Sequence, residues 1–529
     1  MTAAPPPDDP DRLRAEAREH LRGGRVVPAL LTFNRLIERM AAGAADFRLI
    51  GETLSAVGEH AQAVSAFEQS LALDDWPPEV HHGLGQALYR LGETDRAASH
   101  LRVAAERGGA FVSMLALASI LPGCPAAGHE EVLRVRRELT AWLAAGRGGS
   151  PLPPRPPRPP PRERIRVGYL SSWFPAANYM KPVYGLLNAH DRRAVEVHLF
   201  SDAPPDAPFP GYRPGLGDRV HPVAGFENDA VAEAVRLAGI DVLVDLNGAS
   251  SPGRLGLFLS PCAPVVLAWF NQYATSGLPG IDGIVGDGEV VRPEEERFYS
   301  ERVFRLPLSY LTFEVTHPAP PVAPPPAATG GPLRFGSLVS AYKLTDPTLD
   351  LWAEVLSAAP GSRLVLANSA LGKECNRLRL ADRFASRGIG AERLSMLGPA
   401  PHREFLAYYD RIDVALDASP YNGGTTTMEA LWQGVPVLSY CGDRWAGRTT
   451  ASIARRSPAA EFVRGDAKDL VAFAGALAAD PATPARLAAL RRTLRTDLAR
   501  SSACDTASLA RAMESLYRLA LADPAWPGR

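Results

Sequence analysis

The sequence predicts an α-helical solenoid followed by an α/β region of two parallel-sheet domains that face each other across a cleft. In the N-terminal part, small and large residues recur at a constant spacing. Two later blocks each alternate short apolar runs with helical patterns, and proline-rich stretches precede and separate these blocks. Short apolar strands with helices between them are typical of parallel sheets covered on both faces.

The N-terminal part repeats with a period of 34 residues. The recurring positions are Gly24, Gly58 and Gly92, then Ala29, Ala63 and Ala97, then Phe33, Phe67 and Leu101, and finally Gly51 and Gly85. This period is that of tetratricopeptide repeats, in which small residues stand where two helices touch, and ordinary antiparallel helices are the alternative. We expect a disordered segment over residues 1–10 and a repeat domain over residues 11–146. Such stacks usually hold peptides or other proteins.

Two proline-rich stretches divide the chain. The first, "SPLPPRPPRPPPRER", overlaps an expected linker over residues 147–163, and the second, "PAPPVAPPPAATGGP", fills residues 318–332. Because proline cannot continue a helix or donate to a sheet ladder, the first stretch predicts a stiff extended spacer. A ligand for an SH3-type domain is the alternative interpretation of the same prolines.

Residues 164–317 and 333–529 are the two expected Rossmann-like domains, the second with helices at its C-terminal end. The first contains the apolar runs "RIRVGYLSS", "VEVHLFSD", "DRVHPV", "DVLVDLNG" and "APVVLAWF". The second contains "LRFGSLV", "SRLVLANS", "RLSMLG", "DVALDAS" and "VPVLSYC". Ligands of such folds bind beyond the carboxyl ends of the strands, so we expect the functional residues there.

Composition narrows the classes of function. A chain of 529 residues is too long for one core and predicts roughly two to four domains. Its formal net charge of -1 argues against a general nucleic-acid binder. No apolar run is long enough to span a bilayer, and the first residues have no apolar signal-peptide core. Five scattered cysteines without a CxxC pair indicate reduced thiols, and we expect a cytoplasmic protein.

The stretch "DVALDASPYNGGTTTMEALWQGVPVLSY" carries the clearest chemical motif. A strand is expected to end at "DVALD" and a helix to start at Thr425, whose free N–H groups and partial positive charge attract anions. Glycine lets a ligand approach the backbone, and threonine hydroxyls add donors. The predicted diphosphate cradle consists of Asn422, Gly423, Gly424, Thr425, Thr426 and Thr427, and Glu429 is placed to accept hydrogen bonds from ribose hydroxyls. The alternative is a helix N-cap with additional hydroxyls.

Several ordered motifs in this sequence resemble the catalytic half of protein O-GlcNAc transferases and their SPINDLY-type and bacterial relatives. The resemblance runs from about Arg164 to Ala522 and is carried by "RVGYLSS", "LVDLNG", "YATSG", "SAYKLTDPTLDLWAEVL", "PYNGGTTTMEALWQGVPVLSY" and "GDRWAGRTTASI". It implies an inverting glycosyltransferase with the two-domain GT-B fold, preceded by tetratricopeptide repeats. No cofactor is implied, because the nucleotide sugar is a substrate.

The resemblance also implies roles for individual residues. Lys343 matches the family lysine that contacts the nucleotide diphosphate, and an ammonium there stabilises the leaving group. Thr425 and Thr426 match the threonine pair at the diphosphate, and Glu429 matches the ribose-binding acid. The remaining substrate-binding candidates are Ser340 beside Lys343, His402 and Phe405 on the nucleotide side, and Asn247, Ser250, Asn271, Tyr273 and Thr275 on the sugar and acceptor side. A plain capping role for the loop residues is the alternative.

One feature of the family pattern is missing. Many members carry a histidine after the first strand of the catalytic region, and here that position falls at Ala177 or Asn178. Asp245 is the candidate base by its place at a strand end, with Tyr179 behind it, although an aspartate there is also a common loop cap. No DxD motif occurs in the two sheet domains. We therefore expect transfer without a metal ion, with the helix dipole and Lys343 supplying the positive charge.

Three functional hypotheses follow. The first is a protein O-glycosyltransferase that moves a sugar from a UDP-hexosamine, with UDP-N-acetylglucosamine as the expected donor, to a Ser or Thr of a polypeptide held by the repeats. The second keeps this chemistry but uses another nucleotide sugar or a surface protein such as flagellin. The third is an inactive repeat scaffold or nucleotide-binding module, which the missing histidine favours. We expect no nucleic-acid partner, and we expect no membrane span in the chain.

Overall fold

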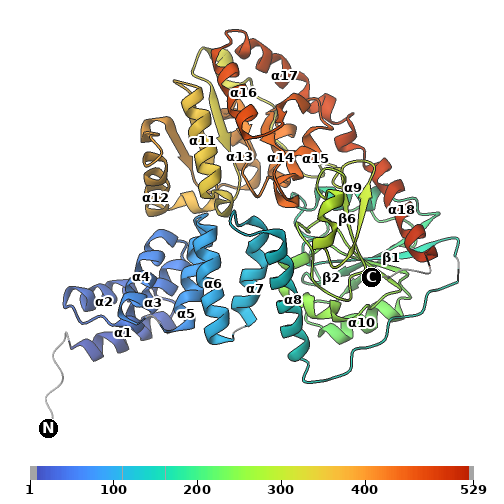
Figure 1. Ribbon diagram of the computed structural model, residues 1–529, viewed down its shortest axis with the longest axis horizontal. Helices are drawn as coiled ribbons and strands as arrows, with labels where there is room; N and C mark the ends of the chain where they lie inside the picture. The colour runs from blue at the N-terminus through green and yellow to red at the C-terminus, as the bar shows by residue number, and fades with distance from the viewer. Residues whose placement is uncertain (1–8, 75, 110, 161, 524–529) are drawn as a thin grey trace.

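The computed structural model describes residues 9–523 apart from residues 75, 110 and 161. The disorder expected over residues 1–10 lies almost wholly outside the described residues, and helix α1 begins at Pro10. Figure 1 shows an N-terminal stack of helices beside two α/β domains, one below and one above the centre of the view. Within the described part, no helix combines the length and apolarity needed to cross a membrane.

Three pairs of antiparallel helices form the N-terminal stack. They are α1 (Pro10–Arg22), α2 (Val26–Glu38), α3 (Ala44–Ala56), α4 (His60–Leu73), α5 (Pro78–Arg90) and α6 (Thr94–Gly108). The 34-residue glycines stand in the turns between paired helices with φ of +68°, +82° and +82°, a region that side-chain-bearing residues rarely adopt. A Cβ on Gly51 would lie 2.7 Å from the ring of Phe67, so the small residue permits the helices to touch. The repeat prediction is confirmed.

Two further helices and a linker connect this stack to the α/β region. They are α7 (Phe111–Ile120) and α8 (His129–Ala145), separated by the short 3₁₀ turn Leu121–Gly123. The proline-rich linker that follows is anchored on the first domain, because the guanidinium of Arg155 donates to both carboxylate oxygens of Asp282, at 2.8 and 2.6 Å. The linker is therefore held against the first domain at Arg155, which disfavours its interpretation as a free SH3 ligand.

The first α/β domain contains a parallel sheet of seven strands. They are β1 (Ile165–Ser171), β2 (Val195–Ser201), β3 (Arg219–Pro222), β4 (Val242–Asp245), β5 (Val265–Ala268), β6 (Gly283–Asp287) and β7 (Arg302–Leu306), in the order β3-β2-β1-β4-β5-β6-β7. Helices α9 (Lys181–Ala189) and α10 (Asn228–Leu237) connect the early strands. The first five strands coincide with predicted apolar runs, while β6 and β7 were not predicted.

The second α/β domain repeats this plan with six parallel strands. They are β8 (Arg334–Ser337), β9 (Arg363–Ala367), β10 (Leu394–Leu397), β11 (Val414–Leu416), β12 (Val437–Tyr440) and β13 (Val463–Arg464), in the order β10-β9-β8-β11-β12-β13. Its helices are α11 (Asp346–Ala358), α12 (Glu374–Ala385), α13 (His402–Leu406), α14 (Thr425–Trp432), α15 (Thr449–Ala454), α16 (Ala467–Ala479) and α17 (Thr483–Leu498). The strand order turns back beside the first strand of each domain, as in Rossmann-like folds.

Polar contacts and the last helix join the two domains. The buried guanidinium of Arg448 in the second domain makes two hydrogen bonds, of 2.8 and 2.7 Å, to the carboxylate of Glu295 in the first. Helix α18 (Thr506–Ala522) follows the second domain in sequence but packs against α9 of the first, where the Tyr517 hydroxyl lies 2.9 Å from that of Tyr169. The same crossing is visible at the right of Figure 1. The two domains are thus joined both by direct polar contacts and by α18.

Candidate functional site

The predicted cradle lies in the second domain, in the loop between the end of β11 and the start of α14. Asp417 closes the strand, and its carboxylate accepts hydrogen bonds from the N–H groups of Ala418 at 3.0 Å and Gly423 at 2.8 Å. Asn422 fixes the same loop from the other side, because its side-chain N–H donates to the carbonyl of Ala418 at 2.8 Å. Buried polar groups with full partners rigidify a loop, so the start of α14 is held in place before any ligand arrives.

Lys343 reaches this loop from the short turn after β8. Its Nζ donates to the carbonyl of Asn422 at 2.6 Å and lies 4.1 Å from the centroid of the Tyr421 ring. Burial lowers the pKa of Lys343 to about 8, against the opposing effect of the Asp417 carboxylate. The side chain is only 9% exposed. A buried ammonium beside a helix N-terminus is a suitable partner for a diphosphate, because the anion replaces the water that the ammonium has lost.

The glycine and threonine residues of the cradle divide into two kinds. A Cβ on Gly423 would lie 2.5 Å from the Thr426 hydroxyl oxygen and 2.7 Å from that of Thr427, so only glycine fits beneath the first turn of α14. The Thr427 hydroxyl is buried and lies 2.8 Å from that of Thr450, which makes it part of the packing. Gly424, Thr425 and Thr426 remain half-buried at the helix start. The geometry thus favours Thr425 and Thr426 over Thr427 as ligand-facing hydroxyls.

Glu429 has partners that sequence reasoning missed. Its Oε1 accepts a hydrogen bond from Nζ of Lys181 at 3.0 Å and lies 2.9 Å from Nε2 of His402. Burial works against ionisation of Glu429, but the charge of Lys181 and the contacts to His402 hold its pKa below the usual value. Lys181 starts α9 of the first domain, so this contact bridges the cleft. Sequence spacing gives no signal for a pair that is 248 positions apart.

A second histidine completes this group. The ring of His317 lies 4.7 Å from that of His402, and its Nε2 is buried without a hydrogen-bond partner among the described residues. His317, His402 and Glu429 bring three potential metal-ligand atoms within 4.8 Å of one another. Lys181 already supplies the positive partner of this carboxylate. The four side chains form a polar wall one helical turn from the cradle.

In the first domain, the strand-end residues mainly hold one another. The Asp245 carboxylate accepts from the N–H groups of Asn247 and Gly248, each at 3.0 Å, and burial raises its pKa to about 6. Asn247 accepts from the Ser172 N–H at 2.9 Å through its side chain and from Nδ2 of Asn271 at 2.8 Å through its carbonyl. These contacts favour the loop-capping role for Asp245 over that of a base. The Asn247 Nδ2 is buried without a partner in the described part of the chain.

Aromatic rings pack against one another within and between the two domains. The Tyr179 ring lies edge-on to Phe270, and burial raises the pKa of its hydroxyl well above the ordinary value, which disfavours it as a base at neutral pH. The Tyr273 ring lies 4.9 Å from that of Tyr421 across the two domains. Phe405 packs with Tyr408, their centroids 5.6 Å apart.

Two predicted hydroxyl residues have structural partners. Thr275 is buried and donates to the Glu301 carboxylate at 2.7 Å, so it holds its loop and does not face an open cleft. Ser250 accepts a hydrogen bond from the Trp173 indole N–H at 3.0 Å, and Ser340 is exposed beside the turn that carries Lys343. Ser250 and Ser340 are both exposed, so their hydroxyls stay accessible to a ligand, whereas that of Thr275 does not.

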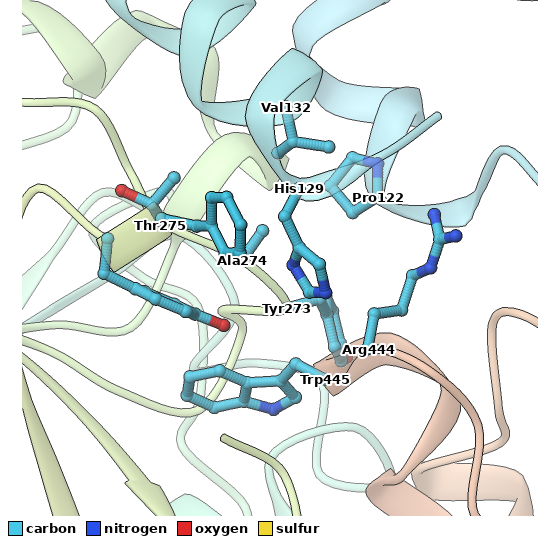
Figure 2. A pocket seen from close by; sticks show the side chains of 10 residues that line it. Pro122, His129, Val132, Tyr273, Ala274, Thr275, Arg444 and Trp445 are labelled. Carbon is cyan, nitrogen blue, oxygen red and sulfur yellow. The ribbon is translucent and has the colours of Figure 1, made fainter. Parts of the chain in front are cut away.

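The helical part also reaches this region, at a small cavity shown in Figure 2. There His129 points from α8 towards Trp445 of the second domain, and residues Tyr273 to Thr275 of the first domain close the other side. The cavity volume is about 20 Å³, which suits roughly one water molecule and no sugar. It marks a packed junction of all three parts of the molecule beside the cleft.

Comparison with known proteins agrees with this geometry. Residues 156–317 and 333–513 match the sequence profile of "Glycosyl transferase family 41". A rice protein described as "Probable UDP-N-acetylglucosamine--peptide N-acetylglucosaminyltransferase SPINDLY" is 33% identical over 298 residues, which are 56% of this chain and 32% of the rice protein. Its Arabidopsis thaliana counterpart is 30% identical over 366 residues, covering 68% of this chain and 39% of that one. The aligned part is thus about a third of the length of these plant relatives.

A solved structure covers nearly the whole chain. The chain is similar to a mutant of the Thermobaculum terrenum O-GlcNAc transferase at 28% sequence identity with a TM-score of 0.73. The alignment covers 98% of this chain and 99% of that one. The helical repeats and the two sheet domains therefore share one arrangement in both proteins.

Proposed function

The chain belongs to glycosyl transferase family 41, and on that premise we propose that it is an inverting protein O-glycosyltransferase. The proposed donor is UDP-N-acetylglucosamine, and the proposed acceptor is a Ser or Thr hydroxyl of a polypeptide that the repeats hold. One observation carries the proposal: the buried ammonium of Lys343 meets the loop that starts α14, at 2.6 Å from the Asn422 carbonyl. Lys343, the N–H groups of α14 and the two half-buried threonines together form a site for a diphosphate.

In the proposed reaction the acceptor oxygen forms a bond to the anomeric carbon while the bond from that carbon to the diphosphate oxygen breaks. UDP leaves with the bonding electrons, and the hydroxyl proton passes to a base. Charge grows on the diphosphate as it departs, so the ammonium of Lys343 and the dipole of α14 stabilise the transition state more than the bound donor. The Glu429 carboxylate takes the ribose hydroxyls in exchange for part of its contact with Lys181.

We also propose that transfer needs no metal ion. The two sheet domains contain no DxD motif, and the cradle has its own positive charge in Lys343. The test is transfer measured after exhaustive treatment with EDTA. An unchanged rate supports the proposal, and a rate restored only by added Mn²⁺ or Mg²⁺ would contradict it.

The proposed donor site is tested by calorimetric titration of the full chain with UDP, UDP-N-acetylglucosamine, GDP and CMP, with Lys343→Ala in parallel. We expect selective binding of the two uridine nucleotides, weakened at least tenfold in the variant because one charge-assisted contact is worth about 1.5–3 kcal/mol. Selective binding of GDP or CMP would keep the site but contradict UDP-N-acetylglucosamine as the donor. The absence of any binding would overturn the proposal.

A nucleotide-binding scaffold is the second candidate, and one observation favours it. Both candidates for the base have unsuitable surroundings, because Asp245 caps a loop and the Tyr179 hydroxyl is hard to ionise. UDP binding without transfer to any protein in a lysate supplied with labelled donor would favour this candidate.

A further inference from the structure

A polar cavity opens where the helical repeats meet the second sheet domain. Its volume is about 440 Å³. From the repeats it is lined by Ser55, Gly58, His60, Gln86 and Arg90, and from the second domain by Ser340, Tyr342 and Ser369. We call it the Arg90 cavity. It lies at the ends of α3 and α5, next to the turn that carries Lys343, and is distinct from the wall around Glu429.

The side chains from the repeats are available to a ligand. Within the described residues, no hydrogen bond or ion pair occupies the side chain of Gln86 or Arg90, and Nδ1 of His60 is buried without a partner. Buried polar atoms in native proteins are normally satisfied, so this one indicates a missing partner. Arg90 is exposed and contributes a full positive charge to the cavity.

The acidic groups around the cavity are already paired. Glu59 lies 3.4 Å from Nζ of Lys373, and Glu93 lies 2.6 Å from Nε of Arg379. On the second domain, Asp346 lies 3.0 Å from Arg383. Since these pairs neutralise one another, the charge of Arg90 is left uncompensated. The cavity therefore favours an anionic group.

The cavity is close to the proposed reacting centre. The Tyr342 ring stacks on that of Tyr89 at 5.0 Å and lies 5.8 Å from that of Tyr421. Nζ of Lys343 lies 4.1 Å from the Tyr421 centroid and 5.8 Å from the Tyr342 centroid. If the acceptor hydroxyl lies at this centre and its chain leaves along the repeats, we expect the chain to pass the rings of Tyr342 and Tyr89. Side chains a few residues from the hydroxyl would then reach Arg90.

We propose that the Arg90 cavity binds an Asp or Glu side chain of the acceptor polypeptide at a fixed distance from the modified hydroxyl. The guanidinium of Arg90 holds the carboxylate through two parallel hydrogen bonds, while His60 and Gln86 bond the acceptor backbone. This inference rests on the proposed function, because it names the acceptor class for the same cleft. It makes the protein selective for acidic sequence around the modified site.

The test is a peptide array bound by the labelled full chain in the presence of UDP. Each peptide carries one Ser or Thr in a Gly/Ala background, with a single Asp, Arg or Gly at one flanking position. We expect the wild type to favour Asp over Gly roughly tenfold or more at one position on one side. No preference for Asp at any position would overturn the proposal.

Charge reversal at Arg90 makes the test specific. Arg90→Glu is expected to transfer the preference from Asp to Arg at the same position, and Arg90→Gln is expected to remove it. The matched control is Arg18→Glu, an exposed arginine of α1 that does not line the cavity, which is expected to keep the Asp preference. An Asp preference that survives in Arg90→Glu would contradict the proposal.

UDP titration of the same variants separates this inference from the proposed function. Selective peptide binding without UDP binding would remove the proposed transferase and leave the acidic-peptide site. UDP binding and transfer that do not depend on Asp in the peptide would support the proposed transferase and overturn the acidic-peptide site.

Discussion

The loops after β4 and β11 are built alike, yet they differ in what they offer a ligand. Each follows a strand in the middle of its sheet, and each begins with a buried aspartate that accepts hydrogen bonds from backbone N–H groups of the loop. Burial raises the pKa of both Asp245 and Asp417. The aspartate is therefore a structural device common to both domains.

The difference lies in what surrounds each loop. The loop after β4 enters the 3₁₀ turn Gly248–Ser250, and its amide side chains bond their neighbours. The loop after β11 enters α14, whose first turn carries the half-buried Thr425 and Thr426, and Lys343 contributes a buried ammonium. An anion site thus requires a helix start and a cation in addition to the strand-end aspartate. The following experiments test this contrast.

Removal of the Lys343 ammonium is expected to have the largest effect. Lys343→Met should lower the rate of UDP release from the donor by about 100- to 1000-fold, as for the loss of one preorganised transition-state contact. The measurement is a coupled assay of UDP release, with Asp245→Asn as the control in the other loop. Comparable losses in both variants would show that the loop after β4 also acts in catalysis.

Loss of each aspartate charge should separate the two loops by stability and by binding. Asp417→Asn is expected to lower the free energy of unfolding by about 3 kcal/mol, because it disrupts the contacts of Asp417 with Gly423 and Ser439. It is also expected to lower the affinity for UDP, because it removes a negative charge near Lys343 and so changes the cradle. Asp245→Asn is expected to cost about 1–2 kcal/mol and to leave UDP affinity unchanged. Urea denaturation and calorimetry measure both quantities. A loss of UDP affinity in Asp245→Asn would contradict the contrast.

Local features of both regions could be predicted from sequence, and long-range partners could not. The glycines at 34-residue spacing predicted helix turns because the requirement for positive φ is local. The "GGTTT" run predicted a helix start because glycine and threonine are favoured at a helix N-terminus, which is also a local preference. The strands β6 and β7 were missed because "GIVGD" and "RVFRL" mix glycine or charge with apolar residues.

Site residues follow the same division. Lys181 and His317 come to Glu429 and His402 only through packing of the two domains, which no spacing reveals. The roles of Thr427 and Thr275 depend on the partners Thr450 and Glu301, which are distant in sequence. The residue types were therefore recognisable, but the division between ligand-facing and structural side chains required the fold.

Titration of Lys343 gives a smaller effect that depends on pH. Its pKa of about 8 means that the free site loses its charge as the pH rises through that value. UDP binding favours the ammonium, so affinity should be steady below pH 8 and fall above it by up to about tenfold per pH unit. Calorimetry between pH 6.5 and about 9.5 tests this, and Lys343→Met should abolish the decline. An equal decline in the variant would assign it to another group.

Titration of Asp245 acts on folding stability and not on UDP affinity. Its folded pKa of about 6 lies above the ordinary value, so its contribution to stability is fully present below the unfolded pKa and is lost as the pH rises through about 6. UDP affinity should not follow this titration.

The smallest expected effect concerns the repeats that pack behind the second loop. Gly92 has φ of +82°, and a Cβ there would lie 2.5 Å from the Leu344 carbonyl oxygen and 2.7 Å from that of Ala341, which flank Lys343. Gly24 has φ of +68° with open space around it. Gly24→Ala should therefore cost only the backbone strain of about 1–2 kcal/mol, whereas Gly92→Ala adds a clash that shifts the turn carrying the ammonium.

We expect Gly92→Ala to lower the affinity for UDP several-fold and Gly24→Ala to leave it unchanged. Both substitutions are expected to lower the melting temperature. Thermal unfolding and UDP titration of the two variants measure the strain and the shift separately. Because the repeats approach the turn beside Lys343, we expect them to support the loop after β11 in addition to their proposed role in acceptor binding. Equal UDP affinities in the two variants would contradict this supporting role. The loop after β11 would then depend on the second domain alone, and acceptor binding would be the remaining proposed role of the repeats.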